Sequence, residues 1–297
     1  MQKVLTKCLA YLAVAFILFG NSCSIDEGGP TGPTGSKSVT EGIEARVDSA
    51  VWKAFNYSAF LCGKQLTIMG LDSTNGKLTI TLNDTVAGKT YDLNTVSAHW
   101  ATYQPNNSND IYTTFSHPLA GGMVFLSLFN KDSLIVSGSF IFYAYNPRTK
   151  RTITISEGDF ANISYTKETY PTSGIRAYID GKLWNATTSQ GTINDDGITL
   201  QGTNAGGEQL FFKICNRLKD TYALNSQSCH MVRYIVSSTD TVPFFSNSSP
   251  YVDGKFVISD ISTDSVAQGS FILSVYRPND KKTVQITQGI FSGIKLR

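Results

Sequence analysis

The residues best suited to chemistry are two serine–histidine pairs, Ser97 with His99 and Ser228 with His230. In each pair the serine precedes the histidine by two positions, so alternation along a strand would place both side chains on one face. A nucleophilic serine needs a base within hydrogen-bond reach and a third group that orients this base. No G-x-S-x-G turn, which would present such a serine, lies near either pair. We therefore interpret both histidines as structural, against the alternative of a hydrolase, and predict a protein that is not an enzyme.

The cysteines predict a disulfide rather than a metal centre. Cys215 and Cys229 lie in consecutive expected strands, and an exported chain would meet an oxidising compartment. We therefore predict a Cys215–Cys229 disulfide, with two free thiols as the alternative. Zinc needs three or four ligands at workable spacing, and the chain has neither C-x-x-C nor H-x-x-x-H. The sequence predicts no metal site and no cofactor.

Aromatic residues around one polar loop form a candidate ligand platform. Trp100, Tyr103 and Tyr112 flank the loop at 104–110. The second copy of this segment carries Met231 in place of Trp100, so the fold does not require this tryptophan. Flat rings at loops are suited to stacking against sugar rings. The alternative is ordinary packing of these three side chains.

A short triplet, Asp followed by Ser or Thr and then a small, aliphatic or Thr residue, recurs along the chain. It resembles the acceptor motif of the O-glycosylation system that Bacteroidota use for exported proteins. The alternative is that Asp-Ser and Asp-Thr are simply good turn formers. The candidate acceptors are Ser49, Ser73, Thr85, Ser133, Thr241 and Ser265.

The elements that must position these residues are written twice in the chain. The repeated features are the glycine-led openings at 42 and 174, the tryptophans Trp52 and Trp184, and the closing segments at 138–160 and 269–291. The offset between copies is 132 residues at the start and 131 from Thr90 onward. The sequence therefore predicts two homologous domains, residues 42–165 and 174–297, joined by a linker at 166–173.

Strand patterns fill each copy. Residues 78–82 alternate apolar and polar side chains, as a strand with one buried face must. The apolar runs at 140–145 and 271–276 each lead into a proline-containing turn and a further strand, which is typical of a hairpin. No segment shows a helical period. The sequence predicts an all-β protein in which each copy has about eight to ten antiparallel strands in a β-sandwich or partly closed barrel.

The N-terminus is typical of an exported lipoprotein. Lys3 and Lys7 precede an uncharged, mostly apolar stretch at 8–20, which is shorter than the roughly 20 residues that cross a bilayer. Ser22-Cys23 resembles a bacterial lipobox, so residues 1–22 are interpreted as a signal peptide and Cys23 as the acylated residue. The Gly/Pro/Thr-rich segment 23–41 is interpreted as a tether. The alternative is ordinary cleavage near Ser22, with Cys23 unmodified.

The charge balance excludes one class of partner. With 25 Lys and Arg against 23 Asp and Glu, the formal net charge is +2, and loss of the signal peptide removes two lysines. A chain this close to neutral lacks the basic surface that nucleic-acid binding requires. We predict no nucleic-acid partner.

Two motifs connect the chain with a known group. The opening A-x-I-D-G-x-x-W at 177–184 and the closing G-S-F and I-T-x-G-x-F segments resemble uncharacterised lipoprotein β-domains of Bacteroidota, the DUF6252-like group. The resemblance covers nearly all of both copies. It implies an exported β-domain and no particular activity.

These observations together predict an outer-membrane lipoprotein. Asp26-Glu27, just after Cys23, resembles the acidic signals that send Bacteroidota lipoproteins to the outer face. We expect a lipid-anchored protein at the cell surface, with the periplasmic face as the alternative. We expect it to be a non-catalytic binding or adhesion module for glycans. The alternative is a structural or assembly partner of another envelope protein.

Overall fold

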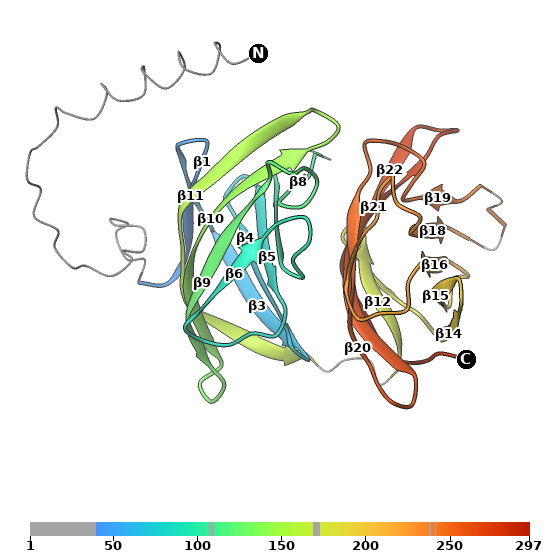
Figure 1. Ribbon diagram of the computed structural model, residues 1–297. Coiled ribbons are helices and arrows are strands. Elements are labelled where there is room, and N and C mark those ends of the chain that lie inside the picture. The colour runs from blue at the N-terminus through green and yellow to red at the C-terminus, as the bar shows by residue number, and fades with distance from the viewer. Residues whose placement is uncertain (1–39, 107, 109, 169–172, 238, 241) are drawn as a thin grey trace, which may run out of the picture. The chain divides into compact units, whose positions relative to one another are not determined.

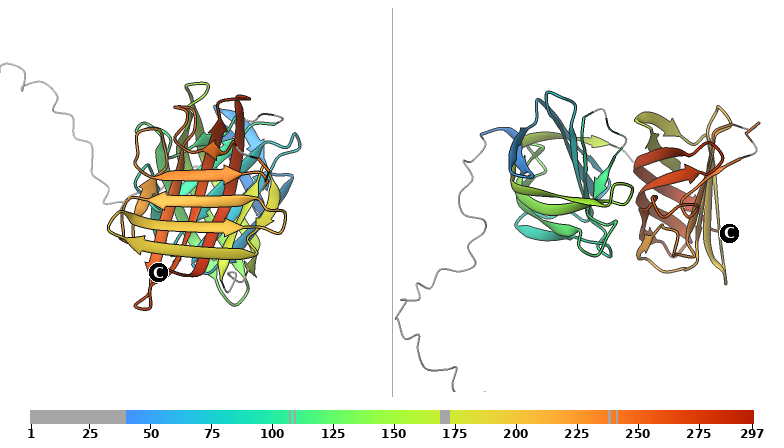
Figure 2. Two further views of the ribbon diagram at one scale, coloured as in Figure 1. Left: turned by 90° about the vertical axis from the view of Figure 1, so that its right-hand side faces the viewer. Right: turned by 90° about the horizontal axis from the view of Figure 1, so that it is seen from above.

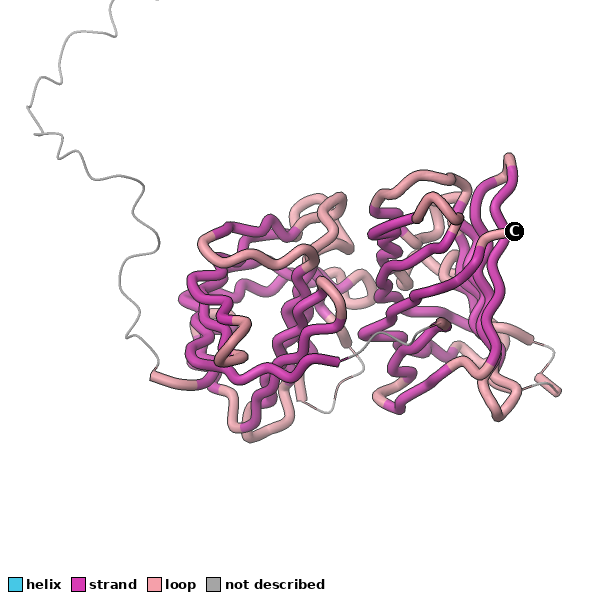
Figure 3. Tube along the Cα trace, turned by 90° about the horizontal axis from the view of Figure 1, so that it is seen from below, coloured by secondary structure: helices cyan, strands magenta, loops and turns pink. Residues whose placement is uncertain are grey.

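The computed structural model describes residues 40–106, 108, 110–168, 173–237, 239–240 and 242–297 (Figure 1). The expected signal peptide, Cys23, nearly all of the tether and Thr241 lie outside these residues. The described part of the chain consists of strands and loops without a helix, which confirms the all-β prediction (Figure 3). None of it, accordingly, forms a helix with the length and apolar character that crossing a bilayer requires. The described residues form one compact unit that holds both copies.

The first copy is a sheet of eleven strands in the order β2-β1-β11-β3-β4-β5-β7-β8-β10-β9-β6. Its strands are β1 (Gly42–Val47), β2 (Ala50–Lys53), β3 (Asn56–Cys62), β4 (Gln65–Leu71), β5 (Lys77–Leu82), β6 (Lys89–Leu93), β7 (Trp100–Gln104), β8 (Tyr112–Thr113), β9 (Gly121–Asn130), β10 (Ile135–Asn146) and β11 (Arg151–Glu168).

The second copy repeats this plan, with β13-β12-β22-β21-β19-β18-β16-β15-β14 in sequence across the sheet and β17 attached through β20. Its strands are β12 (Gly174–Ile179), β13 (Lys182–Asn185), β14 (Thr188–Asn194), β15 (Gly197–Thr203), β16 (Gln209–Ile214), β17 (Thr221–Ala223), β18 (Met231–Ile235), β19 (Phe244–Phe245), β20 (Gly254–Ile261), β21 (Val266–Arg277) and β22 (Lys282–Lys295). In Figure 2 (left), β14, β15, β16 and β18 run across the longer β21 and β22.

Each sheet curls into a partial barrel around its own apolar core, as the sequence predicts. In the first copy the end of β11 pairs in parallel with β3, through Tyr165 and Ala59, and this pairing closes the sheet. In the second copy a single parallel bridge between Gly191 and Leu296 takes the same place. These parallel contacts, and eleven described strands in each copy, depart from the eight to ten purely antiparallel strands expected.

A reciprocal glycine–phenylalanine arrangement explains the closing motif of each copy. On β10 and β11, Phe140 pairs with Gly158 and Phe160 with Gly138, so each ring covers the glycine of the other strand. The two rings stack with their centroids 6.3 Å apart. Gly289 and Gly269 accept the rings of the second copy in the same way. The G-x-F spacing is therefore a packing device, in which a missing side chain makes room for a cross-strand ring.

The repeated tryptophans are core residues. Trp52 and Trp184 are buried, and their rings lie over Gly70 and Gly202. A methyl carbon added at Gly70 would lie 2.8 Å from the Trp52 ring. The opening tryptophan of each copy thus fills its core by packing on a strand position without a side chain.

Candidate ligand-binding cleft

The two matched histidines perform the same local task in each copy. Nδ1 of His99 accepts the backbone N–H of Asn83 at 3.1 Å, just past the end of β5. Nδ1 of His230 accepts the backbone N–H of Cys215 at 3.0 Å, just past the end of β16. Each histidine therefore fastens the segment before β7 or β18 to the end of a neighbouring strand, as the structural interpretation requires.

Neither serine is directed at its histidine ring. Oγ of Ser97 donates to the backbone carbonyl of His99 at 3.0 Å, and Ser228 does the same to His230 at 3.1 Å. Burial, together with the nearby positive charges of Lys89 and Lys255, lowers the pKa of His99 to about 4. Burial also lowers the pKa of His230. Both rings are thus held as neutral acceptors, and the nucleophile–base hydrogen bond of a hydrolase is not formed in either pair.

Cys215 and Cys229 are free thiols that lie close together. The Cys215 thiol donates to the carbonyl of Cys229 at 2.9 Å. Burial, followed by the interaction with Cys229, raises the pKa of Cys215 to about 11. The predicted disulfide is not formed in this structure and stays a prediction.

These two thiols also lie beside His230, with all three ligand atoms within 4.8 Å of one another. The Nδ1 lone pair of His230 is already used by the Cys215 N–H. A metal ion would have to compete with that hydrogen bond, so the cluster as it stands offers two thiols rather than three free ligands.

The three rings of the expected platform do not share a surface. Trp100 and Tyr103 are an odd number of positions apart on β7, so their side chains point to opposite faces of the sheet. Tyr103 and its cross-strand partner Tyr112 pack against the core of the first copy. Trp100 faces outward but is only 2% exposed. The expected platform therefore does not form, because the side chains point to opposite faces of the sheet and the outer face around Trp100 is covered.

The second copy covers Trp100. The indole packs with Phe115 of its own copy and with Val257 and Ile272 of the second, in a small apolar cluster separate from both cores. The position that differs between the copies, Trp100 against Met231, is therefore a contact residue between them. This role explains why one copy has the tryptophan and the other does not.

A buried lysine fixes the same contact. Nζ of Lys255 on β20 donates to the backbone carbonyls of Asn94, Ser97 and His99, at 2.7 Å for Ser97. It also lies 5.4 Å from the centre of the Phe115 ring. Burial lowers the pKa of Lys255 to about 7. A lone lysine within the apolar run 254–258 is the sequence signal that would have pointed to this contact.

A cleft of about 970 Å³ opens beside this contact, and both copies line it. Its walls come from the loop after β7, the hairpin turn after β10, the turns between β12 and β13 and between β21 and β22, and the segment before β20. The polar loop noted in the sequence belongs to this lining through Gln104, Ser108 and Asp110. The other hydroxyl, amide and aromatic side chains that line the cleft are Thr102, Thr113, Phe115, Asn146, Tyr251, Ser274, Thr283, Gln285 and Thr287.

One wall of the cleft is held in place by an ion pair. Asp110 accepts hydrogen bonds from the Arg148 guanidinium, at 2.7 Å from Nε, and from Nδ2 of Asn146 at 3.3 Å. Partial burial acts to raise the pKa of Asp110, but the hydrogen bonds from Arg148, Ser108 and Asn146 outweigh it and hold this pKa below its usual range. The loop and the hairpin turn are thereby locked to each other, so that this wall is formed before any ligand arrives.

The opposite wall contains a buried carboxyl group. Oδ2 of Asp253 is buried and has no hydrogen-bond partner among the described residues. Burial raises the pKa of Asp253 to about 6, although a hydrogen bond with Ser116 opposes the shift. An unpaired buried acceptor is costly, and nothing among the described residues offsets that cost for this oxygen.

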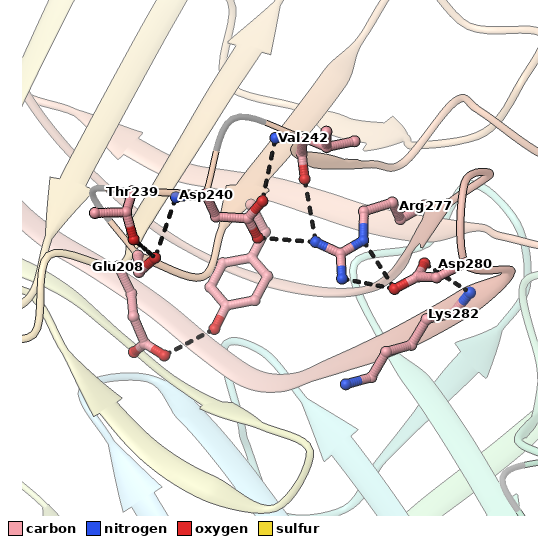
Figure 4. A network of polar contacts seen from close by, with 9 residues as sticks. Glu208, Thr239, Asp240, Val242, Arg277, Asp280 and Lys282 are labelled. Atoms are coloured by element: carbon pink, nitrogen blue, oxygen red, sulfur yellow. Dashed lines mark hydrogen bonds and ion pairs between the residues drawn. The ribbon is translucent and has the colours of Figure 1, made fainter.

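The second copy has a related clamp, which holds one of the turns that line the cleft (Figure 4). Arg277 donates to Asp240 at 2.8 Å and to Asp280 at 2.6 Å, and so ties the loop after β18 to the turn after β21. The Asp110–Arg148 pair ties the matching loop and turn of the first copy. The three clamp residues do not line the cleft themselves, but they hold the turn that contributes Lys281 and Lys282 to it, so we interpret the clamp as a structural support of that wall.

The candidate glycosylation residues lie between strands. Ser49, Ser73 and Ser133 are exposed in turns, whereas Thr85 and Ser265 are half-buried. Ser49 has a φ of 74°, close to the 77° of Gly181 at the same place in the second copy. The turn therefore keeps its shape without a glycine. Modification of these residues stays a prediction.

The comparisons place the chain in a family. A model of the Domain of unknown function DUF6252 matches residues 40–164 and again residues 171–295. The chain therefore belongs to the DUF6252 family and contains the domain twice in tandem. No curated protein and no solved structure matches the chain.

Proposed function

We propose that this protein is a lipid-anchored, non-catalytic binding module that holds an uncharged glycan in the cleft between its two β-domains. The observation that carries this proposal is the composition of the cleft. Its walls combine hydroxyl and amide side chains with aromatic rings, around a volume of about 970 Å³. Sites for small ligands favour such concave positions between domains, with polar groups that fix the orientation of the ligand.

The chemistry of the lining matches a sugar better than an anion or an apolar ligand. Gln104, Asn146 and Thr283 offer donors and acceptors that suit hydroxyl groups. Tyr251 is 51% exposed and lines the cleft, so its ring is available for stacking against the C–H face of a sugar. Four basic and three acidic residues line the cleft, so the charges of its walls nearly balance: Lys77, Arg148, Lys281 and Lys282 against Asp110, Asp180 and Asp253.

The proposed address is the outer membrane of a Bacteroidota-like cell. It rests on the signal-like residues 1–22, on Cys23 and on the tether, together with the resemblance stated above. A lipid on Cys23 would hold the cleft near the membrane without a transmembrane helix.

Replacing Tyr251 with Ala should weaken glycan binding by about tenfold or more, because the most accessible ring of the cleft is lost. The purified protein is screened against an array of neutral polysaccharides, and each hit is measured by calorimetry. The matched control is Phe55→Ala, which removes an aromatic ring that is 83% exposed and outside the cleft. Equal binding by the two variants, or the absence of any hit for the wild type, would contradict the proposal.

The anchor is tested separately. In a host that processes bacterial lipoproteins, the wild-type chain should incorporate labelled palmitate, and Cys23→Ser should lose that label. Cys62→Ser serves as the control, because Cys62 is buried in the first domain. Unchanged labelling of the Cys23 variant would refute the anchor and leave the proposed ligand site untouched.

A further inference from the structure

The contact between the two domains joins two different faces of the same fold. The first domain contributes the outer face of β5 and β7 with Trp100, which we call the β7 face. The second contributes the outer face of β20 and β21 with Val257 and Ile272, which we call the β20 face. Because the domains are homologous, each of them has both faces. The chain therefore uses two faces internally and leaves two without a partner inside the chain.

The unused face of the first domain is apolar and exposed. It lies on β9 and β10, the counterparts of β20 and β21, where cross-strand pairing places Met123, Phe125 and Tyr143. Their exposed fractions are 49%, 42% and 47%. Cross-strand pairing matches Met123, opposite Ile141, with Lys255, opposite Ile272, and matches Phe125 with Val257 in the same way, one position beyond the offset of 131. Lys255 and Val257 are 1% and 4% exposed. The same place on the fold is thus covered in one domain and open in the other.

The unused face of the second domain is the counterpart of the β7 face of the first domain. It lies on β16 and β18, where Phe211 and Met231 stand in place of Thr79 and Trp100. Thr79 and Trp100 are buried, whereas Phe211 and Met231 are partly exposed. Arg233 lies 5.1 Å above the Phe211 ring. The free face of the second domain is therefore less apolar than the occupied one: Phe211 replaces the smaller Thr79, but Met231 replaces the larger Trp100, and the exposed Lys213 stands across from Met231 in place of Thr81.

We propose that two molecules of this chain bind head to tail. The outer face of β9 and β10 in one molecule docks on the outer face of β16 and β18 in the other. The contact repeats between molecules the contact that already joins the two domains, so continuity with that interface identifies the occupant. Such a contact is heterologous, and it generates a ring if the rotation closes or an open chain if it does not.

The contact between molecules is weaker than the internal one. Lys255 bonds three backbone carbonyls of the first domain, but its counterpart Met123 has no hydrogen to donate. The internal contact is also made at the high effective concentration that a short linker provides. We therefore expect association that increases with protein concentration and reverses on dilution.

The test uses the full chain in detergent and measures the mass of the protein by light scattering over a range of concentrations. Wild type should move from one chain towards larger multiples. Phe125→Glu and Met231→Glu should each stay monomeric, because each breaks one half of the contact at a surface position. Thermal unfolding close to that of wild type confirms that both variants fold.

The decisive sample is an equimolar mixture of the two variants. Phe125→Glu retains an intact β16–β18 face, and Met231→Glu retains an intact β9–β10 face. The mixture should therefore form dimers and nothing larger. A wild type that stays monomeric at every concentration overturns the proposal. So does a variant pair in which only one substitution abolishes association, since that outcome indicates a symmetric contact or a different partner.

Cross-linking gives an independent readout. In the contact between the two domains, Lys255 lies against the carbonyls on either side of Ala98. The counterpart of Lys255 in the first domain is Met123, and the counterpart of Ala98 in the second domain is Cys229. Met123→Cys, combined with Cys215→Ser so that Cys229 has no thiol neighbour in its own chain, should therefore form a disulfide between chains with Cys229 on mild oxidation. Adding Cys229→Ser to this variant should abolish the link. Leu183→Cys, at a site 55% exposed and outside both faces, is the control, and equal linking there overturns the proposal.

Discussion

Gly158→Ala and Gly289→Ala are each expected to destabilise their own domain by about 3 kcal/mol or more. A methyl carbon at Gly158 would lie 2.3 Å from the ring of Phe140, and one at Gly289 would lie 2.2 Å from the ring of Phe271. Both rings are buried among other aromatic side chains and cannot move aside without opening the core. The midpoint of thermal or urea unfolding measures the loss.

The matched control is Gly206→Ala, where the nearest atom would be Oδ1 of Asn204 at 3.4 Å in an exposed turn. This substitution should change the midpoint very little. If Gly158→Ala were tolerated as well as Gly206→Ala, the cross-strand rings would not be packed as described.

Trp100→Ala is expected to cost about 3–5 kcal/mol, the usual range for removing a fully buried large aromatic side chain. The loss falls on the contact between the domains rather than on either core, because the indole packs with Val257 and Ile272 of the second domain. We therefore expect a single cooperative unfolding transition in the wild type to separate into two in the variant. Differential scanning calorimetry distinguishes the two outcomes.

Met231→Ala provides the comparison at the matching position of the second domain. Met231 is partly exposed and lies outside the apolar cluster between the domains, so its truncation should have a much smaller effect on unfolding. Equal effects of the two substitutions would mean that Trp100 is not a contact between domains. An unchanged transition for Trp100→Ala would mean that its ring is free, as the sequence-based platform requires.

Much of the fold could be predicted because the two copies agree wherever the core requires it. Trp52 and Trp184 recur because each packs over a glycine, and Phe140 and Phe271 recur because each fills the space of a cross-strand glycine. These requirements are local to a pair of strands. The alternation of side chains records them directly, so the sequence was sufficient to predict the strands and the duplication.

The candidate site could be predicted only in part. The loop containing Gln104 was correctly noted as polar and does line the cleft. The rings assigned to it were placed wrongly, because Tyr103 points into the core and Trp100 lies under the second domain. The sequence does not identify Tyr251 and Asp253 as cleft residues, because each is a single aromatic or polar residue in a segment between strands with no distinguishing pattern.

The sequence by itself determined that this chain is a pair of like-folded β-domains and where each core lies, because burial inside a domain imposes a repeated pattern on neighbouring strands. Only the tertiary structure decided which outer faces are covered and that a cleft opens beside them. The residues at outer-face positions differ between the copies, and their burial depends on what lies against the sheet and not on the strand that carries them. Trp100 is buried and Met123 exposed for that reason alone.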